Sequence, residues 1–272
     1  MANKLIKELR EISGKDGLFD VNGTVISYKS GFPVLDYYLG YLVNIYNSND
    51  ELVEQRPSIG IPGGCYLTAI GKPSTSKTTS MVQIASNIVR PFQNGFVIHF
   101  DLEQSMNYSR IQVLSKFKMS EMDEKYILRQ EKNSISDIKK SIIEIYMEKT
   151  RNPDEYKYNT GEKDEFGNEI IAYEPTVVII DSIATLSTHV NENDKKEAAK
   201  LEDVTSQTDR MRLTAEIGRF FTELLPYIRT ANIIVLTINQ IKTNPGMGIV
   251  KSPSEILYLK QDETLRIWGI IK

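Results

Sequence analysis

The sequence predicts an α/β fold built on a mostly parallel, twisted sheet with helices on both faces. Apolar stretches of strand length alternate along the chain with stretches in which apolar residues recur at helical spacing, as in strands joined by helical crossovers. The stretch 176–180 shows no alternation of polar and apolar residues, which indicates a strand buried on both faces. A polar loop at 71–76 separates the first core strand from the first core helix, as in many parallel α/β domains.

The individual elements are predicted in the following order. A short amphipathic helix is expected at 4–12, followed by a linker and by a core that begins near residue 25. Buried strands are predicted at 65–70, 96–101, 176–180 and 232–238. Core helices are predicted after residue 77, at 135–150 behind the capping-box pair Ser134 and Asp137, and at 213–225. The polar stretch 151–174 is interpreted as a loop or hairpin inserted into the core.

The composition is that of an ordinary soluble globular protein. Of the 272 residues, 40% are hydrophobic and 25% are charged, and the net charge is −3. No apolar run approaches the roughly 18 residues of a membrane span, and the first residues lack the apolar core of a signal peptide. Cys65 is the only cysteine, which excludes an internal disulfide and argues against a structural zinc site. We therefore expect a cytoplasmic protein that makes no membrane contact.

One stretch has the spacing of a phosphate-binding loop apart from a single position. Its residues are, in order, Gly71, Lys72, Pro73, Ser74, Thr75, Ser76, Lys77, Thr78 and Thr79. Backbone N–H groups of such a loop surround the phosphates, and the helix N-terminus adds partial positive charge. Lys77 is expected to reach the β- and γ-phosphates, and the hydroxyl of Thr78 to ligate Mg²⁺. The stretch therefore predicts ATP and Mg²⁺ as cofactors.

Ser76 is the position that departs from the pattern, because a glycine normally precedes the lysine. That glycine allows a backbone conformation that costs a residue with a Cβ atom about 1 kcal/mol. A well-packed loop tolerates such a cost. The alternative interpretation of this segment alone is a polar surface turn that contains Lys-Thr.

Polar side chains follow three of the predicted strands. Asp181 is placed to hold Mg²⁺ at the end of its strand, with capping of the next segment as the alternative. Glu103 is a candidate to orient and deprotonate the water that attacks ATP, whereas Asp101 still belongs to the strand end and is expected to be structural. Gln240 and its neighbour Asn239 offer neutral amides that could respond to the γ-phosphate, or simply end a strand.

Four sites in this order resemble the RecA-like strand-exchange recombinases, especially phage-type (UvsX-like) members. The matching stretches are GKPSTSKTT at 71–79, FDLEQS at 100–105, VVIIDSIATL at 177–186 and LTINQIK at 236–242. Upstream, SGFPVLDYYLG at 30–40 and IPGG at 61–64 look like the entry into the family's core. The resemblance covers the chain from about residue 25 to about residue 260.

The resemblance implies a RecA-like ATPase core at 25–272, preceded by an N-terminal helix and linker at 1–24 that contacts another protomer. It makes Glu103 the catalytic glutamate and Gln240 the γ-phosphate sensor, and Tyr108 resembles the tyrosine that stacks on adenine. Two DNA-binding loops would fall at about 188–212 and 241–256, with the DNA-contacting residues Arg210, Arg212, Lys242 and Lys251. Cationic side chains on such loops suit phosphate contacts without sequence reading.

The implied function is that of an ATP-dependent DNA recombinase with DNA-dependent ATPase activity. It would form filaments on single-stranded DNA and promote pairing and strand exchange with homologous duplex DNA, in a bacterial host cell if the chain is phage-encoded. Its partners would be both DNA forms, further copies of itself, and mediator and single-strand-binding proteins.

The sequence leaves two other functions open, and the C-terminal stretch of the chain, which departs from the family pattern, bears on them. A replicative helicase-type motor shares the core, although no N-terminal helical domain is evident here. A catalytically inert fragment that binds nucleotide or DNA is the third candidate. The stretch 265–271 has no clear counterpart in the family, so the core is expected to be incomplete at the C-terminus.

Overall fold

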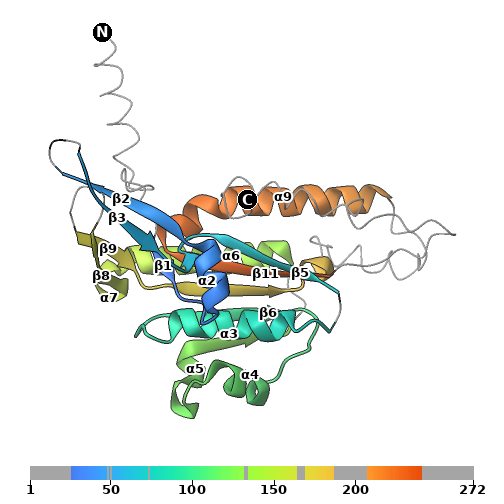
Figure 1. The fold of residues 1–272 in the computed structure, drawn as a ribbon. Coiled ribbons are helices and arrows are strands. Elements are labelled where there is room, and N and C mark those ends of the chain that lie inside the picture. Colours follow the sequence, from blue (N-terminus) through green and yellow to red (C-terminus); the bar gives the residue numbers. More distant parts are fainter. Residues whose placement is uncertain are drawn as a thin grey trace, which may run out of the picture.

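Five parallel strands form the central sheet of the computed structural model, which describes residues 26–47, 49, 51–72, 74–131, 134–163, 169–186 and 207–240 (Figure 1). Across the sheet the strands lie in the order β5–β11–β10–β6–β7. Every neighbouring pair in this sheet is parallel, so the carboxyl ends of all five strands meet at one edge. Their bounds are Tyr66–Gly71 for β5, Phe96–Asp101 for β6, Tyr126–Arg129 for β7, Thr176–Asp181 for β10 and Ile233–Gln240 for β11.

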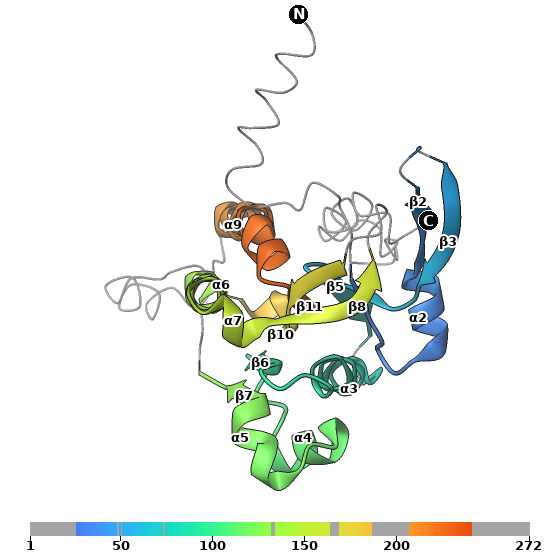
Figure 2. The ribbon, with the colours of Figure 1, turned by 90° about the vertical axis from the view of Figure 1, so that its left-hand side faces the viewer.

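Helices cover both faces of this sheet, which confirms the predicted α/β architecture (Figures 1 and 2). The side chains of β10 alternate between two cores: Val177 and Ile179 belong to one, and Val178 and Ile180 to the other. All six residues of this strand are buried, which explains why its sequence shows no polar alternation. One face carries α3 (Lys77–Val89), α4 (Tyr108–Ser115) and α5 (Met122–Lys125), and the other carries α6 (Ile135–Arg151) and α9 (Gln207–Thr230).

The local sequence of α6 explains where this helix begins and which of its faces is buried. Ser134 and Asp137 form the predicted capping box, in which each side chain accepts a hydrogen bond from the other residue's backbone N–H. Four isoleucines at helical spacing are buried against the sheet, namely Ile135, Ile138, Ile142 and Ile145. An N-terminal cap of this kind contributes about 1 kcal/mol, and most of the remaining stability comes from the buried stripe.

Smaller elements surround the main sheet. The antiparallel pairs are β1 (Ser27–Tyr28) with β4 (Ile61–Pro62), β2 (Tyr41–Tyr46) with β3 (Leu52–Ser58), and β8 (Lys157–Lys163) with β9 (Glu169–Tyr173). The short helices are α2 (Pro33–Leu39) and α7 (Pro153–Tyr156), and 3-10 turns lie at Met119–Glu121 and Ile183–Thr185. The β8–β9 pair confirms the hairpin alternative that was predicted for 151–174.

Several elements differ from the prediction, which did not include α4, α5, α7 or the β2–β3 pair. The strand β7 was not predicted, because its four residues are too few to show a periodicity. The helix α9 begins at Gln207, six residues before the predicted start at 213, and its first turns are polar. The predicted helix at 4–12, Lys242, Lys251 and the tail at 265–271 lie outside the described residues. None of the helices in the described part combines the length and the apolarity that a membrane crossing requires.

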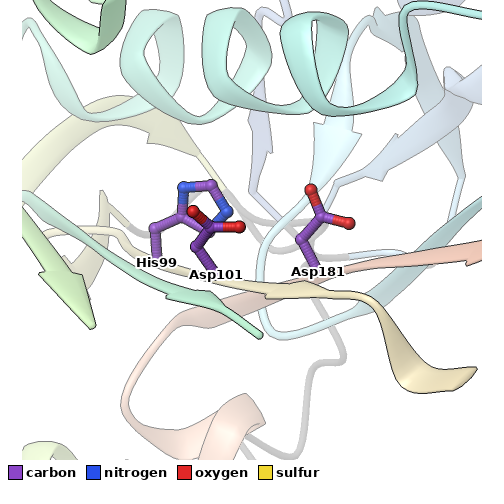
Figure 3. A group of neighbouring side chains, drawn as sticks. All are labelled: His99, Asp101 and Asp181. Carbon is purple, nitrogen blue, oxygen red and sulfur yellow. The ribbon is translucent and has the colours of Figure 1, made fainter. Parts of the chain in front are cut away.

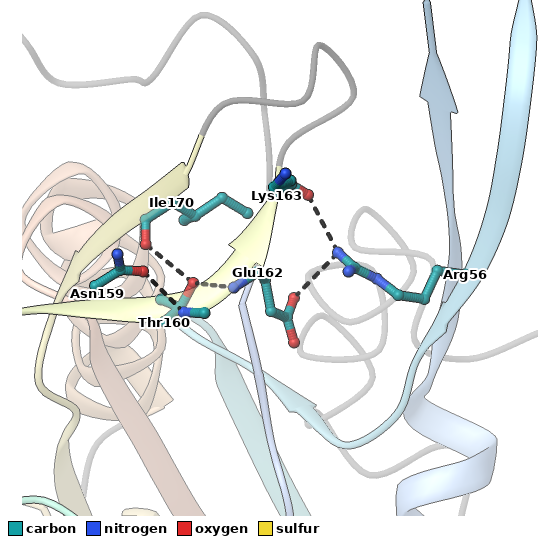
Figure 4. Close-up of polar contacts among 7 residues, drawn as sticks. Arg56, Asn159, Thr160, Glu162, Lys163 and Ile170 are labelled. Carbon is teal, nitrogen blue, oxygen red and sulfur yellow. Dashed lines mark hydrogen bonds and ion pairs between the residues drawn. The ribbon is translucent and has the colours of Figure 1, made fainter.

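The two hairpins β2–β3 and β8–β9 meet through Arg56 (Figure 4). Its guanidinium donates a hydrogen bond of 3.1 Å to the carbonyl oxygen of Lys163 and lies 3.8 Å from the carboxylate of Glu162. The hairpin β8–β9 is also anchored to the body of the protein, because the hydroxyl of Tyr158 lies 3.1 Å from that of Tyr28. Figure 1 shows both hairpins at the edge of the sheet opposite the carboxyl ends of β5, β10 and β11.

Two ionisable side chains, one thiol and one amine, are buried near the residues that lead into the main strands. Cys65, just before β5, is 3% exposed, and burial raises the pKa of its thiol to about 12. Lys149, on α6, is 1% exposed and donates hydrogen bonds of 2.5 and 2.9 Å to the carbonyl oxygens of Glu174 and Ala231. Burial lowers the pKa of Lys149 to about 7, although the charge of Glu174 acts in the opposite direction. The lysine therefore joins α6 to the segments that lead into β10 and β11.

The buried lysine makes stability depend on pH. Between about pH 7 and pH 10.5 the unfolded chain holds a proton on Lys149 that the folded chain has lost, so a rise in pH favours folding across this window. We expect the free energy of unfolding of the parent, relative to Lys149→Met, to increase as the pH rises from 7 to 10. Urea unfolding at several pH values measures this difference. Lys140→Met, which changes an exposed lysine, should run parallel to the parent; a parallel course for Lys149→Met would contradict the prediction.

Candidate functional site

The loop between β5 and α3 contains two residues in the left-handed backbone region. Ser74 has a φ of 61° and Ser76 a φ of 60°. Ser76 thus adopts the conformation that a glycine at this position would favour. Gly71 at the start of the loop is also tightly surrounded, because a Cβ atom there would lie 3.0 Å from Oγ1 of Thr75. The loop is therefore a strained, tight turn directly before the helix.

The first turn of α3 is open to an anion. Ser76 is its N-cap but makes no side-chain capping bond, and the first turn contains no acidic residue. The uncapped N–H groups and the helix dipole place partial positive charge there. The ammonium group of Lys77 folds back over the loop and donates hydrogen bonds of 3.1 and 2.7 Å to the carbonyl oxygens of Gly71 and Lys72. Positive charge and N–H donors therefore converge where the loop enters the helix.

Thr78 and Asp181 are in direct contact across the sheet edge. The hydroxyl of Thr78 donates a hydrogen bond of 2.6 Å to Oδ2 of Asp181. The two residues come from α3 and from the end of β10, with β11 lying between β5 and β10 in the sheet. Burial, together with the charges of Glu103 and Asp101, raises the pKa of Asp181 to about 6, although the Thr78 hydrogen bond and the charge of Lys77 act in the opposite direction. A cation beside this carboxylate would oppose the rise.

Asp101 and His99 lie next to Asp181 on the same side of the sheet (Figure 3). Asp101 accepts hydrogen bonds from the backbone N–H groups of Ser105 and Met106 and from the amide of Gln130. These bonds show that Asp101 shapes the segment after β6, in line with the structural role expected for it.

His99 is a buried neutral imidazole within this group. Its Nδ1 lies 2.8 Å from the hydroxyl of Tyr126, whereas its Nε2 has no hydrogen-bond partner. Burial lowers the pKa of His99 to about 4, against the opposing effect of the Asp101 charge. One ligand atom from each of His99, Asp101 and Asp181 lies within 4.8 Å of the others. Within the described ranges, these three form a buried group that could hold a metal ion.

Glu103 lies just past the end of β6 and contacts the residue that follows Asp181. The hydroxyl of Ser182 donates a hydrogen bond of 2.7 Å to Oε1 of Glu103. The peptide bond between Asp181 and Ser182 is cis. Sequence reasoning did not identify Ser182, because no local spacing indicates a partner 79 residues away.

The remaining predicted residues fall near the same edge or outside the description. Gln240 ends β11 and is paired in register with Gly71. Tyr108 begins α4 and is 50% exposed, and two residues later Arg110 donates a 3.2 Å hydrogen bond to the hydroxyl of Thr79. The first turn of α4 therefore lies beside the first turn of α3.

The predicted DNA-contacting residues are less fully described. The backbones of Arg210 and Arg212 lie in α9, and their side chains are outside the described part. Lys242 and Lys251, as well as Pro73 of the loop, also fall outside it.

A scan of the chain against protein-family models found no match, and neither did a search of curated proteins.

The left-handed conformation of Ser76 leads to a stability prediction. Ser76→Gly should raise the free energy of unfolding by about 0.5–1 kcal/mol, because glycine adopts a positive φ without the Cβ penalty. Urea unfolding measures the change. The control Ser80→Gly, four residues further along α3, should lower stability by about 0.5–1 kcal/mol, since glycine inside a helix is unfavourable. Destabilisation by both variants would contradict the assignment of strain to Ser76.

Proposed function

We propose that this protein is an ATP-dependent DNA recombinase with a RecA-like core, which binds ATP and Mg²⁺ at the carboxyl edge of its parallel sheet. The observation that carries the proposal is the hydrogen bond between Thr78 and Asp181. It brings a hydroxyl and a carboxylate together directly beside the strained loop and the open first turn of α3. Ligands of parallel α/β sheets bind at this edge, where strand ends and helix N-termini converge.

The residues present fit a triphosphate and its metal ion. Oxygen atoms from a threonine hydroxyl and an aspartate are the ligands that Mg²⁺ prefers. The uncapped N–H groups of α3 and the ammonium of Lys77 offer donors to phosphate oxygens, which would replace the loop carbonyls that Lys77 now contacts. Mg²⁺ bound there would neutralise charge that develops on the phosphates.

The other roles follow from position. Glu103 would deprotonate the attacking water, Gln240 would contact the γ-phosphate from the end of β11, and Tyr108 would stack on the adenine from the start of α4. Support for these roles is that all three residues lie at the elements that surround the loop. DNA would bind through Arg210, Arg212, Lys242 and Lys251.

The proposed partners are single-stranded DNA, homologous duplex DNA and further copies of the chain in a filament, with mediator and single-strand-binding proteins as accessory factors. The compartment that suits these partners is the cytoplasm, in a bacterial host if the chain is phage-encoded.

Nucleotide binding is tested by changing the cation of the loop. Lys77→Ala should weaken ATP binding about 10- to 100-fold, because a charge-assisted hydrogen bond to phosphate is lost. Titration calorimetry with a slowly hydrolysed ATP analogue and Mg²⁺ measures the affinity. Lys140→Ala is the matched control, because this exposed lysine lies on α6, across the sheet from the loop. Equal affinities of both variants for the analogue would contradict the assignment of the loop.

Turnover is tested with Glu103→Gln, and assembly is tested with the parent protein. This variant should bind the ATP analogue as the parent does, while its DNA-stimulated ATPase rate falls about 100-fold or more, because the general base is lost. With the analogue and single-stranded DNA, electron microscopy of the parent should show helical filaments. Closed rings would favour a helicase-type motor, and DNA binding without any parental turnover would favour an inert nucleotide-binding fragment.

A further inference from the structure

Two hydrogen bonds join the segments that leave β6 and β10 at the carboxyl edge. The backbone N–H of Leu102 donates to the carbonyl oxygen of Asp181 at 2.7 Å, which extends the parallel pairing beyond the two strands. One residue further on, the hydroxyl of Ser182 donates to Oε1 of Glu103 at 2.7 Å. The side chain of Glu103 is thus attached to the segment that carries Asp181.

Of the two partners in the second bond, Ser182 is the fixed one. It is fully buried, and its carbonyl oxygen accepts hydrogen bonds from the backbone N–H and the hydroxyl of Thr185, at 3.1 and 2.7 Å. Glu103 is exposed and has a long side chain with several rotatable bonds. The hydroxyl of Ser182 therefore restrains the carboxylate of Glu103.

We propose that Ser182 is a positioning residue that aims the carboxylate of Glu103 at the attacking water; this inference rests on the ATPase function proposed above. In that reaction the water oxygen bonds to the γ-phosphorus, and the bond from this phosphorus to the β–γ bridging oxygen breaks. The carboxylate of Glu103 accepts the proton of the water, and the products are ADP, phosphate and a proton that is later released. Ser182 takes no proton and holds the base in one orientation.

The placement of Ser182 also links the base to the metal side of the site. Ser182 follows Asp181 directly in the chain, and Asp181 is bonded to Thr78. A ligand that moves the Thr78–Asp181 pair would therefore move the anchor of Glu103 as well. This relation distinguishes Ser182 from a serine that merely fills space at a strand end.

The test compares steady-state ATP hydrolysis by the full chain with single-stranded DNA and Mg²⁺. Ser182→Ala should lower kcat about tenfold or more, because the carboxylate of Glu103 loses the hydroxyl that orients it, while the KM for ATP stays within about twofold. The control Ser105→Ala removes another hydroxyl after β6, one that contacts Asp101 and not Glu103, and should keep the parental kcat. Ser182→Cys, similar in size but a weak donor, should lie below the parent and serves as the second variant should Ser182→Ala fail to fold.

A double-mutant cycle separates positioning from a structural role. In the Glu103→Gln background, Ser182→Ala should change kcat by less than about twofold, because both changes act through the same carboxylate. A similar fall in both backgrounds, or an unchanged or higher kcat in Ser182→Ala alone, would overturn the inference. A parent that hydrolyses no ATP would instead overturn the proposed function, and with it the role given to Ser182.

Discussion

The hydrogen bond between Thr78 and Asp181 joins the first core helix to the central strand of the sheet, and the rest of the candidate site is arranged around it. For this contact the start of α3 must reach from β5 past β11 to the end of β10, because β11 lies between those two strands in the sheet. The right-handed crossovers that are usual in parallel sheets allow this path. Because the strand ends coincide in register, Asp101 lies directly opposite Asp181 on the neighbouring strand. Burial and the nearby charges of Glu103 and Asp101 raise the pKa of Asp181, which favours a site that binds cations.

The depth of burial around this edge explains how the loop can keep its strain. The strand β10 is buried on both faces and divides its side chains between two cores. The apolar side chains of α3 pack on one of these cores, so the start of the helix is held in place by contacts that do not depend on the loop. Left-handed residues such as Ser74 and Ser76 persist where the surrounding structure determines the backbone path. Packing away from the site thus fixes the geometry within it.

Much of this arrangement could be predicted from the sequence, and the failures have physical causes. The long buried strands, the capping box of α6 and the meeting of Thr78 with Asp181 follow from periodicity, local chemistry and the shared edge of parallel strands. The short strand β7 was missed because it is defined by pairing with β6 and not by its own pattern. Ser182 and Gln130 were missed because their partners, Glu103 and Asp101, are distant in the chain. Such contacts depend on the folded topology, which the local sequence does not encode.

The burial of Cys65 has a practical consequence for attaching a fluorescent label to this protein. Its thiol lies inside the core and has a pKa of about 12, so almost no reactive thiolate forms near neutral pH. A cysteine introduced at the exposed Ile171 on β9 would then be the only thiol that a maleimide dye could modify. Because that hairpin lies at the edge opposite the loop between β5 and α3, a fluorophore there would sit away from the candidate site.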